Sequence, residues 1–210
     1  MDSVIAAVIH DAKNSLNALN AWLDEAERQA PGEALTLARG AAQRVSAQLV
    51  ELLVLYRAGE GTLRLTIDDH HVGDMVRELL SEITPAPGQP VPAVDLPAID
   101  AIGEWAFDAY QVKLVLADAL RNALRYAQRR VALQVFAVAG NGLCFEVRDD
   151  SEGYPPHILA GQDPGPEAGG TGLGLRFARL IAGRHATPSG RQGRVELAND
   201  DGAVFRVFLP

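Results

Sequence analysis

Four segments of the chain combine residue types that could carry out chemistry, and the first surrounds His10. Asp11 follows it directly, and Asn14 comes one helical turn later, on the same face of a helix. A carboxylate beside an imidazole can accept the proton of one ring nitrogen, which fixes the tautomer and leaves the other nitrogen nucleophilic. An ordinary exposed histidine with a neighbour four residues on would look the same. For this segment alone, that second interpretation is favoured.

In the second segment, Asp118, Asn122 and Arg125 follow one another at intervals of four and three residues. This spacing places two oxygen-bearing side chains and one cation on the same face of a helix. Oxygen ligands of this kind can hold Mg2+, and an arginine can hold a phosphate group. A solvated helix face would give the same pattern. However, asparagine has a poor propensity for the middle of a helix, which weakens that interpretation.

The third segment is a turn that follows an expected strand. Asp149 stands at the end of this strand, and Gly153 lies four residues later. A carboxylate in this place can accept a hydrogen bond from an exocyclic amine such as that of adenine. A plain acidic turn would look similar, so the segment alone is weak evidence.

The fourth segment is the glycine-rich loop of residues 169–175, which runs into an apolar helical stripe. Free backbone N–H groups at a helix N-terminus bind anions, and glycine allows a polyphosphate to approach closely. The loop is neither a Walker loop, which needs Gly-Lys-Ser/Thr, nor a Rossmann fingerprint, which follows the first strand. A phosphate-binding role is favoured over a flexible linker because the leucines between the glycines continue into the helix.

The composition limits the partners and the compartment. The 210 residues include 19 basic and 27 acidic side chains, and the net charge of −8 argues against nucleic acid or an anionic membrane as the main partner. The one cysteine, Cys144, permits no internal disulfide and favours a reducing cytoplasm. No apolar run is long enough to cross a bilayer, and the first residues do not resemble a signal peptide. We expect a soluble, cytoplasmic chain without a membrane segment.

The first 58 residues predict an antiparallel pair of helices. Apolar residues recur at alternating intervals of three and four from Ile5 to Ala26, and again from Leu35 to Tyr56, with Pro31-Gly32 between the two runs. Two helices with one apolar stripe each cannot enclose a core. We therefore expect a homodimer through residues 3–58, in which two hairpins form a four-helix bundle.

From about residue 62 the pattern changes to mixed α and β structure. Leu63, Leu65 and Ile67 alternate as in a short strand, and the proline-rich residues 84–98 predict an irregular connection. The expected fold class is α+β, a helical hairpin followed by an α/β sandwich. Helices are expected at 72–83, 108–127 and 173–183, and two strand hairpins at 131–147 and 194–209.

In their order along the chain, the four segments resemble the sequence boxes of the two-component sensor histidine kinases. The resemblance covers nearly all of the chain, and four boxes in the right order at the right separations are specific. The matching segments are His10–Leu16 for the H-box, Asp118–Tyr126 for the N-box, Asp149–Gly153 for the G1 box, Gly170–Leu175 for the G2 box and Gly202–Pro210 for the final strand.

The resemblance implies a fold and an activity. Residues 1–60 would form the dimerisation and phosphoacceptor hairpin, and residues 61–210 the ATP-binding domain of the gyrase, MutL and histidine kinase type. The chain would phosphorylate His10 with ATP and then transfer the phosphoryl group to an aspartate on a response-regulator receiver domain. Asp11 would set the tautomer of His10, and Asn14 would support dephosphorylation of the regulator.

The resemblance also implies a nucleotide site that uses ATP and Mg2+. Asn122 would hold the metal ion, with assistance from Asp118, and Asp149 would select adenine. The residues expected around the nucleotide are Asp118, Asn122, Arg125, Asp149, Gly153, Gly170, Thr171, Gly172, Leu173 and Gly174.

Several departures from the family pattern leave two alternatives open. Asp118 replaces the usual first Asn of the N-box, Ser151 replaces a glycine of the G1 box, and residues 149–175 contain no Lys or Arg. Only nine residues precede His10, which suggests an orphan or truncated kinase. The main alternative is a phosphotransfer protein that relays phosphate between receiver domains with a degenerate ATPase domain. A protein-serine kinase of the same superfamily is a third interpretation, which would leave His10 unexplained.

Overall fold

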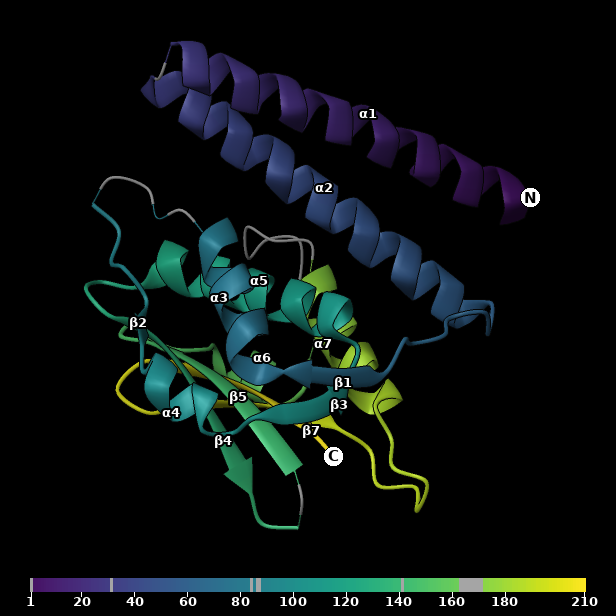
Figure 1. The fold of residues 1–210 in the computed structure, drawn as a ribbon, viewed down its shortest axis with the longest axis vertical. Coiled ribbons are helices and arrows are strands. Elements are labelled where there is room, and N and C mark those ends of the chain that lie inside the picture. Colours follow the sequence, from purple (N-terminus) through teal and green to yellow (C-terminus); the bar gives the residue numbers. More distant parts are fainter. Residues whose placement is uncertain (1, 31, 84, 86–87, 141, 163–171) are drawn as a thin grey trace. The chain divides into compact units, whose positions relative to one another are not determined.

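The computed structural model describes residues 2–30, 32–83, 85, 88–140, 142–162 and 172–210, with backbone only for residues 2–11, 13, 27, 33 and 37 (Figure 1). The chain divides into two compact units, Met1–Leu63 and Arg64–Pro210. In the described part of the chain, no helix is both long and apolar enough to cross a membrane.

The first unit is a helical hairpin, as the apolar spacing predicts. Helix α1 (Asp2–Gln29) packs against helix α2 (Glu33–Gly59) in the opposite direction (Figure 1). The amide Nδ2 of Asn20 donates a hydrogen bond to Ser46 Oγ at 3.2 Å, which links the two helices by a polar contact. Part of each predicted apolar stripe stays exposed, notably Leu19 on α1 and Val45 and Leu52 on α2.

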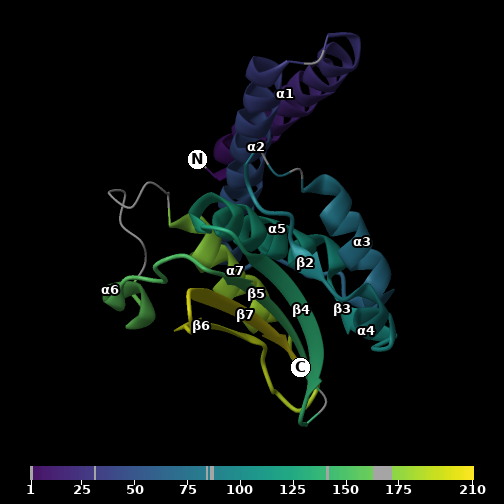
Figure 2. The same ribbon diagram turned by 90° about the vertical axis from the view of Figure 1, so that its left-hand side faces the viewer.

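The second unit is built on a five-stranded sheet. The strand order is β2-β4-β5-β7-β6, with β2 parallel to β4 and the other neighbours antiparallel. Helices α5 and α7 lie on one face of this sheet, and α3 packs beside α5 (Figure 2). The strands are β2 (Ala93–Val94), β4 (Val131–Val138), β5 (Gly142–Asp149), β6 (Arg194–Asn199) and β7 (Ala203–Leu209), and the helices are α3 (Val72–Glu82), α5 (Ala109–Tyr126) and α7 (Leu173–Arg184).

The core lies between the helices and the sheet. Helix α5 buries a continuous apolar stripe that includes Leu116 and Leu120, and it packs against β5, whose Phe145 and Val147 are also buried. Each large side chain buried in this way contributes about 1.5–3 kcal/mol. The core therefore fixes α5 and the end of β5 relative to each other, and these two elements carry predicted site residues.

Two buried polar groups hold the far ends of α5 and α7 together. Asp108 caps α5 by accepting a hydrogen bond from Gln111 N at 3.0 Å, and it also accepts one from Thr66 N at 2.9 Å. His185, which follows α7, accepts a hydrogen bond from Asp108 N through Nε2 at 3.0 Å, and its Nδ1 lies 2.8 Å from Ile181 O. Burial lowers the pKa of His185, in keeping with a neutral ring that accepts through Nε2.

Two sequence predictions are wrong in this unit. No strand forms at residues 63–67; strand β1 (Asp68–His71) lies further on and pairs with β3 (Glu104–Phe107), which the sequence did not reveal. The proline-rich segment is not wholly irregular either, because it contains β2 and the start of the short helix α4 (Leu96–Asp100), which Asp95 caps. A further short helix, α6 (Pro156–Leu159), lies beyond β5. The predicted helices and both strand hairpins are confirmed to within a few residues.

Candidate functional site

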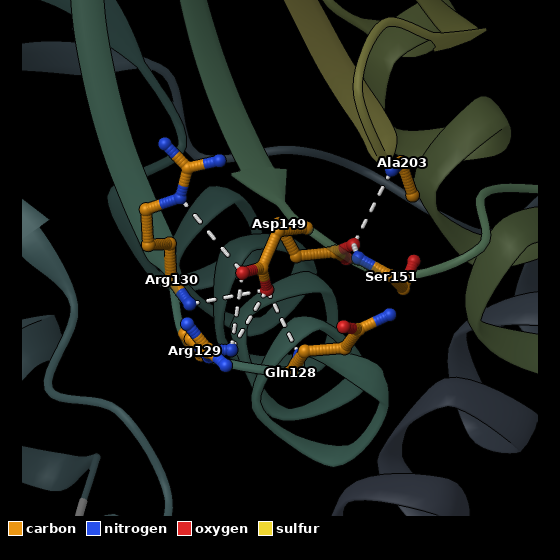
Figure 3. A network of polar contacts seen from close by, with 7 residues as sticks. Gln128, Arg129, Arg130, Asp149, Ser151 and Ala203 are labelled. Atoms are coloured by element: carbon orange, nitrogen blue, oxygen red, sulfur yellow. Dashed lines mark hydrogen bonds and ion pairs between the residues drawn. The ribbon is translucent and has the colours of Figure 1, made fainter.

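Asp149 is the last residue of β5, and the described residues form hydrogen bonds with only one of its two carboxylate oxygens. Its Oδ1 accepts hydrogen bonds from Ser151 N at 2.8 Å and from Ala203 N at 3.2 Å (Figure 3). Among the described residues, no donor forms a hydrogen bond with Oδ2. The backbone therefore fixes the orientation of Asp149 through one oxygen and leaves the other able to accept a hydrogen bond from a ligand.

The next residue, Asp150, holds the turn against the loop between α5 and β4. Its carboxylate accepts hydrogen bonds from the backbone N–H groups of Arg129, Arg130 and Gln128 at 2.9–3.1 Å (Figure 3). These bonds lower the pKa of Asp150 to about 2. The sequence shows only an acidic pair here, so the role of Asp150 as an anchor was not predictable from it.

Ser151 fits the turn without backbone strain. Apart from glycines, Asp201 with φ 53° is the only described residue in the left-handed region, so Ser151 does not need the conformation that favours glycine. The Ser151 Oγ instead accepts a hydrogen bond from Gly153 N at 3.1 Å. Gly153 itself has φ +86°, which explains the glycine at this position.

Asp118 and Asn122 lie on α5 where α7 begins. Asn122 Nδ2 donates a hydrogen bond to Asp118 Oδ2 at 3.2 Å, so the predicted shared face is present. A Cβ on Gly174 would lie 2.1 Å from Asp118 Oδ2, which shows that the first turn of α7 is packed directly against this carboxylate. Gly172 caps α7 with φ 67°. The glycines thus allow a close approach between α7 and the carboxylate-bearing face of α5.

The environment of Asp118 disfavours its charge. Burial raises the pKa of the Asp118 carboxyl, while the positive charge of Arg121 and the hydrogen bond from Asn122 lower it. Arg125 is exposed, and its guanidinium lies 5.4 Å from the centre of the Tyr126 ring.

Tyr154 follows the turn after β5 and is half-buried. Burial raises the pKa of its hydroxyl, and the negative charges of Asp149 and Asp118 raise it further. The bonds from Gln128, Arg129 and Arg130 to Asp150 join this turn to the loop that follows α5, and Tyr154 is a member of the turn that sequence reasoning missed.

Other predicted residues cannot be placed in the site. The side chains of His10 and Asp11 lie outside the described ones, although the backbone of both belongs to α1, and Gly170 and Thr171 lie outside the described residues. Asn14 is exposed on α1. The predicted roles of His10, Asp11 and Asn14 in phosphoryl transfer stay predictions.

The described side chains could bind a divalent ion only together with oxygen atoms of a ligand. They contain no group of three or more His, Cys, Asp or Glu that could hold a metal. Magnesium is commonly held by one or two protein oxygens together with the phosphates of a substrate, and Asp118 and Asn122 can supply such oxygens. Their chemistry therefore fits Mg2+ brought by a nucleotide.

Comparison with known proteins relates the second unit to a described family. Residues 107–210 match the family described as "Histidine kinase-, DNA gyrase B-, and HSP90-like ATPase". The chain is 27% identical to the signal transduction histidine-protein kinase AfsQ2 of Streptomyces coelicolor over 98% of its length, and 26% identical to the sensory histidine kinase/phosphatase NtrB of Salmonella typhimurium over 99%. It spans 41% of the first relative and 61% of the second.

Solved structures show the same fold. The Acinetobacter baumannii histidine kinase AdeS superimposes with a TM-score of 0.62 and 17% identity, over 93% of this chain and 95% of that one. Full-length ShkA, solved in complex with AMPPNP, superimposes with a TM-score of 0.64 and 17% identity, over 99% of this chain and 45% of that one.

Proposed function

The C-terminal part of this chain is an ATPase domain of the two-component sensor histidine kinase type, and on that basis we propose that the chain is an autophosphorylating protein-histidine kinase. In this proposal ATP phosphorylates His10, and the phosphoryl group then passes to an aspartate of a response-regulator receiver domain. The observation that carries the proposal is the close packing of the first turn of α7 against Asp118, together with the carboxylate of Asp149 that the backbone fixes at the end of β5. This arrangement offers separate groups for the base and for the phosphates of one nucleotide.

Each part of the nucleotide has a matching group. The vacant acceptor Oδ2 of Asp149 would receive the exocyclic amine of adenine. The N-terminus of α7, with the glycine-rich loop before it, would bind the phosphates through backbone N–H groups. Asn122 would hold Mg2+ together with Asp118. When bound there, Mg2+ would neutralise phosphate charge, which matters because residues 149–175 contain no Lys or Arg.

The chemical step would use the hairpin. One ring nitrogen of His10 would attack the γ-phosphorus of ATP, a nitrogen–phosphorus bond would form, and ADP would leave with the bridging oxygen. Asp11 would accept a hydrogen bond from the other ring nitrogen and stabilise the positive charge on the ring. Asn14 would support dephosphorylation of the regulator by orienting a water molecule toward its aspartyl-phosphate.

We also propose that the chain works as a homodimer through residues 3–58. Leu19, Val45 and Leu52 belong to the apolar stripes of the hairpin and are 39–46% exposed. A second hairpin that covered these stripes would complete a four-helix bundle.

A relay protein that never binds ATP is the second candidate, and the absence of Lys and Arg from residues 149–175 favours it. Calorimetric titration with ADP and Mg2+ separates the two. The kinase requires binding by the wild type and a loss of affinity of about tenfold to a hundredfold in Asp149→Ala, because a charged hydrogen-bond acceptor is removed. Glu196→Gln is a matched control, since Glu196 pairs with Arg194 on the exposed side of β6. If the wild type does not bind ADP at millimolar concentration, the relay protein becomes the favoured function.

A further inference from the structure

The turn between β6 and β7 lies against the turn that carries Asp149. Asn199 is the last residue of β6 and pairs with Ala203, the first residue of β7. Ala203 N donates to Asp149 Oδ1 at 3.2 Å (Figure 3). A Cβ on Gly202 would lie 1.9 Å from the backbone oxygen of Asp149, so the hairpin approaches the end of β5 as closely as its backbone permits.

Asn199 makes a two-way contact with the far end of the Asp149 turn. Tyr154 N donates to Asn199 Oδ1 at 2.8 Å, and Asn199 Nδ2 donates to Tyr154 O at 3.0 Å. Because a backbone N–H can only donate and a carbonyl can only accept, these two bonds fix the orientation of the amide. The side chain therefore pairs with Tyr154 as a neighbouring strand would.

The amide of Asn199 also packs against Gly153. A Cβ on Gly153 would lie 2.6–2.8 Å from three atoms of this amide. From Gly153 the contacts continue to Asp149, because Gly153 N donates to Ser151 Oγ and Ser151 N donates to Asp149 Oδ1. A continuous series of contacts therefore leads from Asn199 to the carboxylate that would bind the base.

We propose that Asn199 is a positioning residue for base recognition: by pairing with the backbone of Tyr154 it holds the turn in which Asp149 presents Oδ2 to the exocyclic amine of adenine. This inference rests on the proposed nucleotide site. Asn199 lies outside the four sequence boxes. Because Asn199 is exposed, its replacement leaves the apolar core intact.

The test compares two nucleotides that differ at the recognised group. ADP carries the exocyclic amine, whereas IDP has a carbonyl oxygen in its place. With Mg2+ present, Asn199→Ala should weaken ADP binding by about fivefold to tenfold, the usual effect of losing one well-placed hydrogen bond. The affinity for IDP should change by less than twofold, so the ratio of the ADP affinity to the IDP affinity should fall. Glu196→Gln, on the same strand, should leave both affinities unchanged.

A double variant shows whether Asn199 acts through Asp149. In the Asp149→Asn background, Asn199→Ala should cause no further loss of ADP affinity, because the oriented acceptor is already gone. If Asn199→Ala fails to fold by circular dichroism, Asn199→Asp serves instead, since it keeps the acceptor for Tyr154 N and its ADP preference should be intermediate.

Equal loss of ADP and IDP affinity, or no loss of either, would overturn the role of Asn199. Additive effects of Asn199→Ala and Asp149→Asn on ADP binding would overturn it as well. These results differ from failure of the proposed function, in which the wild type itself would bind neither nucleotide.

Discussion

The candidate site has two sides. The proposed base side is the turn of residues 149–153, and the proposed phosphate side is the face of α5 that carries Asp118 beside the start of α7. The two sides hold their carboxylates in opposite ways. On the base side, Asp150 accepts hydrogen bonds from three successive backbone N–H groups, and its pKa falls to about 2. On the phosphate side, Asp118 is packed against Gly174 and hydrogen-bonded by Asn122, and burial raises its pKa. One carboxylate is stabilised as an anion by the fold, and the other is not.

This difference indicates how the two sides would work. The Asp149 turn is held by backbone groups from β7 and from the loop after α5, and by the side chain of Asn199. It is preorganised before any nucleotide arrives, and preorganisation reduces the entropy lost on binding. Asp118 lacks a comparable set of donors among the described residues, so a bound cation would supply the positive charge that the fold does not.

The largest expected loss of stability comes from the replacement of Gly202, a glycine on the base side. A Cβ on Gly202 would overlap the backbone oxygen of Asp149 at 1.9 Å, and φ +135° is unsuited to alanine. Since neither backbone can move without opening the turn, Gly202→Ala should lower the free energy of unfolding by about 3 kcal/mol or more, measured by urea denaturation.

Gly183→Ala is the matched control for Gly202→Ala. Gly183 lies within α7 and has open space around its Cα, so alanine there should stabilise the protein by about 0.5–1 kcal/mol. A Gly202→Ala protein as stable as the wild type would show that the β6–β7 turn does not press on Asp149.

On the phosphate side, the corresponding replacement of Gly174 should lower the free energy of unfolding by a smaller amount. A Cβ on Gly174 would meet Asp118 Oδ2 at 2.1 Å, but this atom is the end of a side chain that can rotate away. We expect Gly174→Ala to destabilise the protein by about 1–2 kcal/mol. In the presence of Asp118→Ala the same change should cost much less, because the atom it meets is gone. Strictly additive free energies in this double-mutant cycle would rule out the contact.

The two carboxylates also predict opposite responses to pH. For Asp150, the folded pKa of about 2 lies below the unfolded value of 3.8, so its contribution is complete above about pH 4 and is lost as the pH falls to about 2. For Asp118 the folded pKa is raised, so its charge opposes folding as the pH rises above the unfolded value.

Urea midpoints measured from pH 2 to 7 distinguish these contributions. Asp150→Asn should lose less stability than the wild type on acidification, and Asp118→Asn should gain stability relative to the wild type as the pH rises. The lowered pKa of His185 adds acid sensitivity to all three proteins, so the differences between them isolate the two carboxylates. Parallel pH curves for the three proteins would contradict both assignments.

The sequence predicts the helices and the long strands well because their apolar periodicity is strong. It predicts β1 badly, since Asp68–His71 contains no apolar alternation and the alternation at residues 63–67 lies just before it. Thr66 is held by the side chain of Asp108 instead of by a strand partner, and no local pattern reveals such a contact.

Within the site, the sequence predicts the residues that local spacing marks, but not those whose contacts lie far away along the chain. The Asp118–Asn122 pair follows from helical spacing, and Asp149 follows from its place at a strand end. The side chains of Asp150 and Asn199 bond to backbone groups of residues distant in the sequence, and Tyr154 supplies the backbone groups that Asn199 binds; none of these residue types signals such contacts. The roles of His10 and Asp11 rest on the sequence alone.

Incubation of the purified chain with γ-labelled ATP and Mg2+ tests the central claim most directly. The kinase requires label on the protein that is lost in acid and survives in alkali, as expected of a phosphoimidazole. His10→Gln should remove the label while ADP binding, measured by calorimetry, is unchanged. Label that persists in His10→Gln, or a wild type that binds ADP but takes up no label, would contradict the assignment of His10 as the phosphoacceptor.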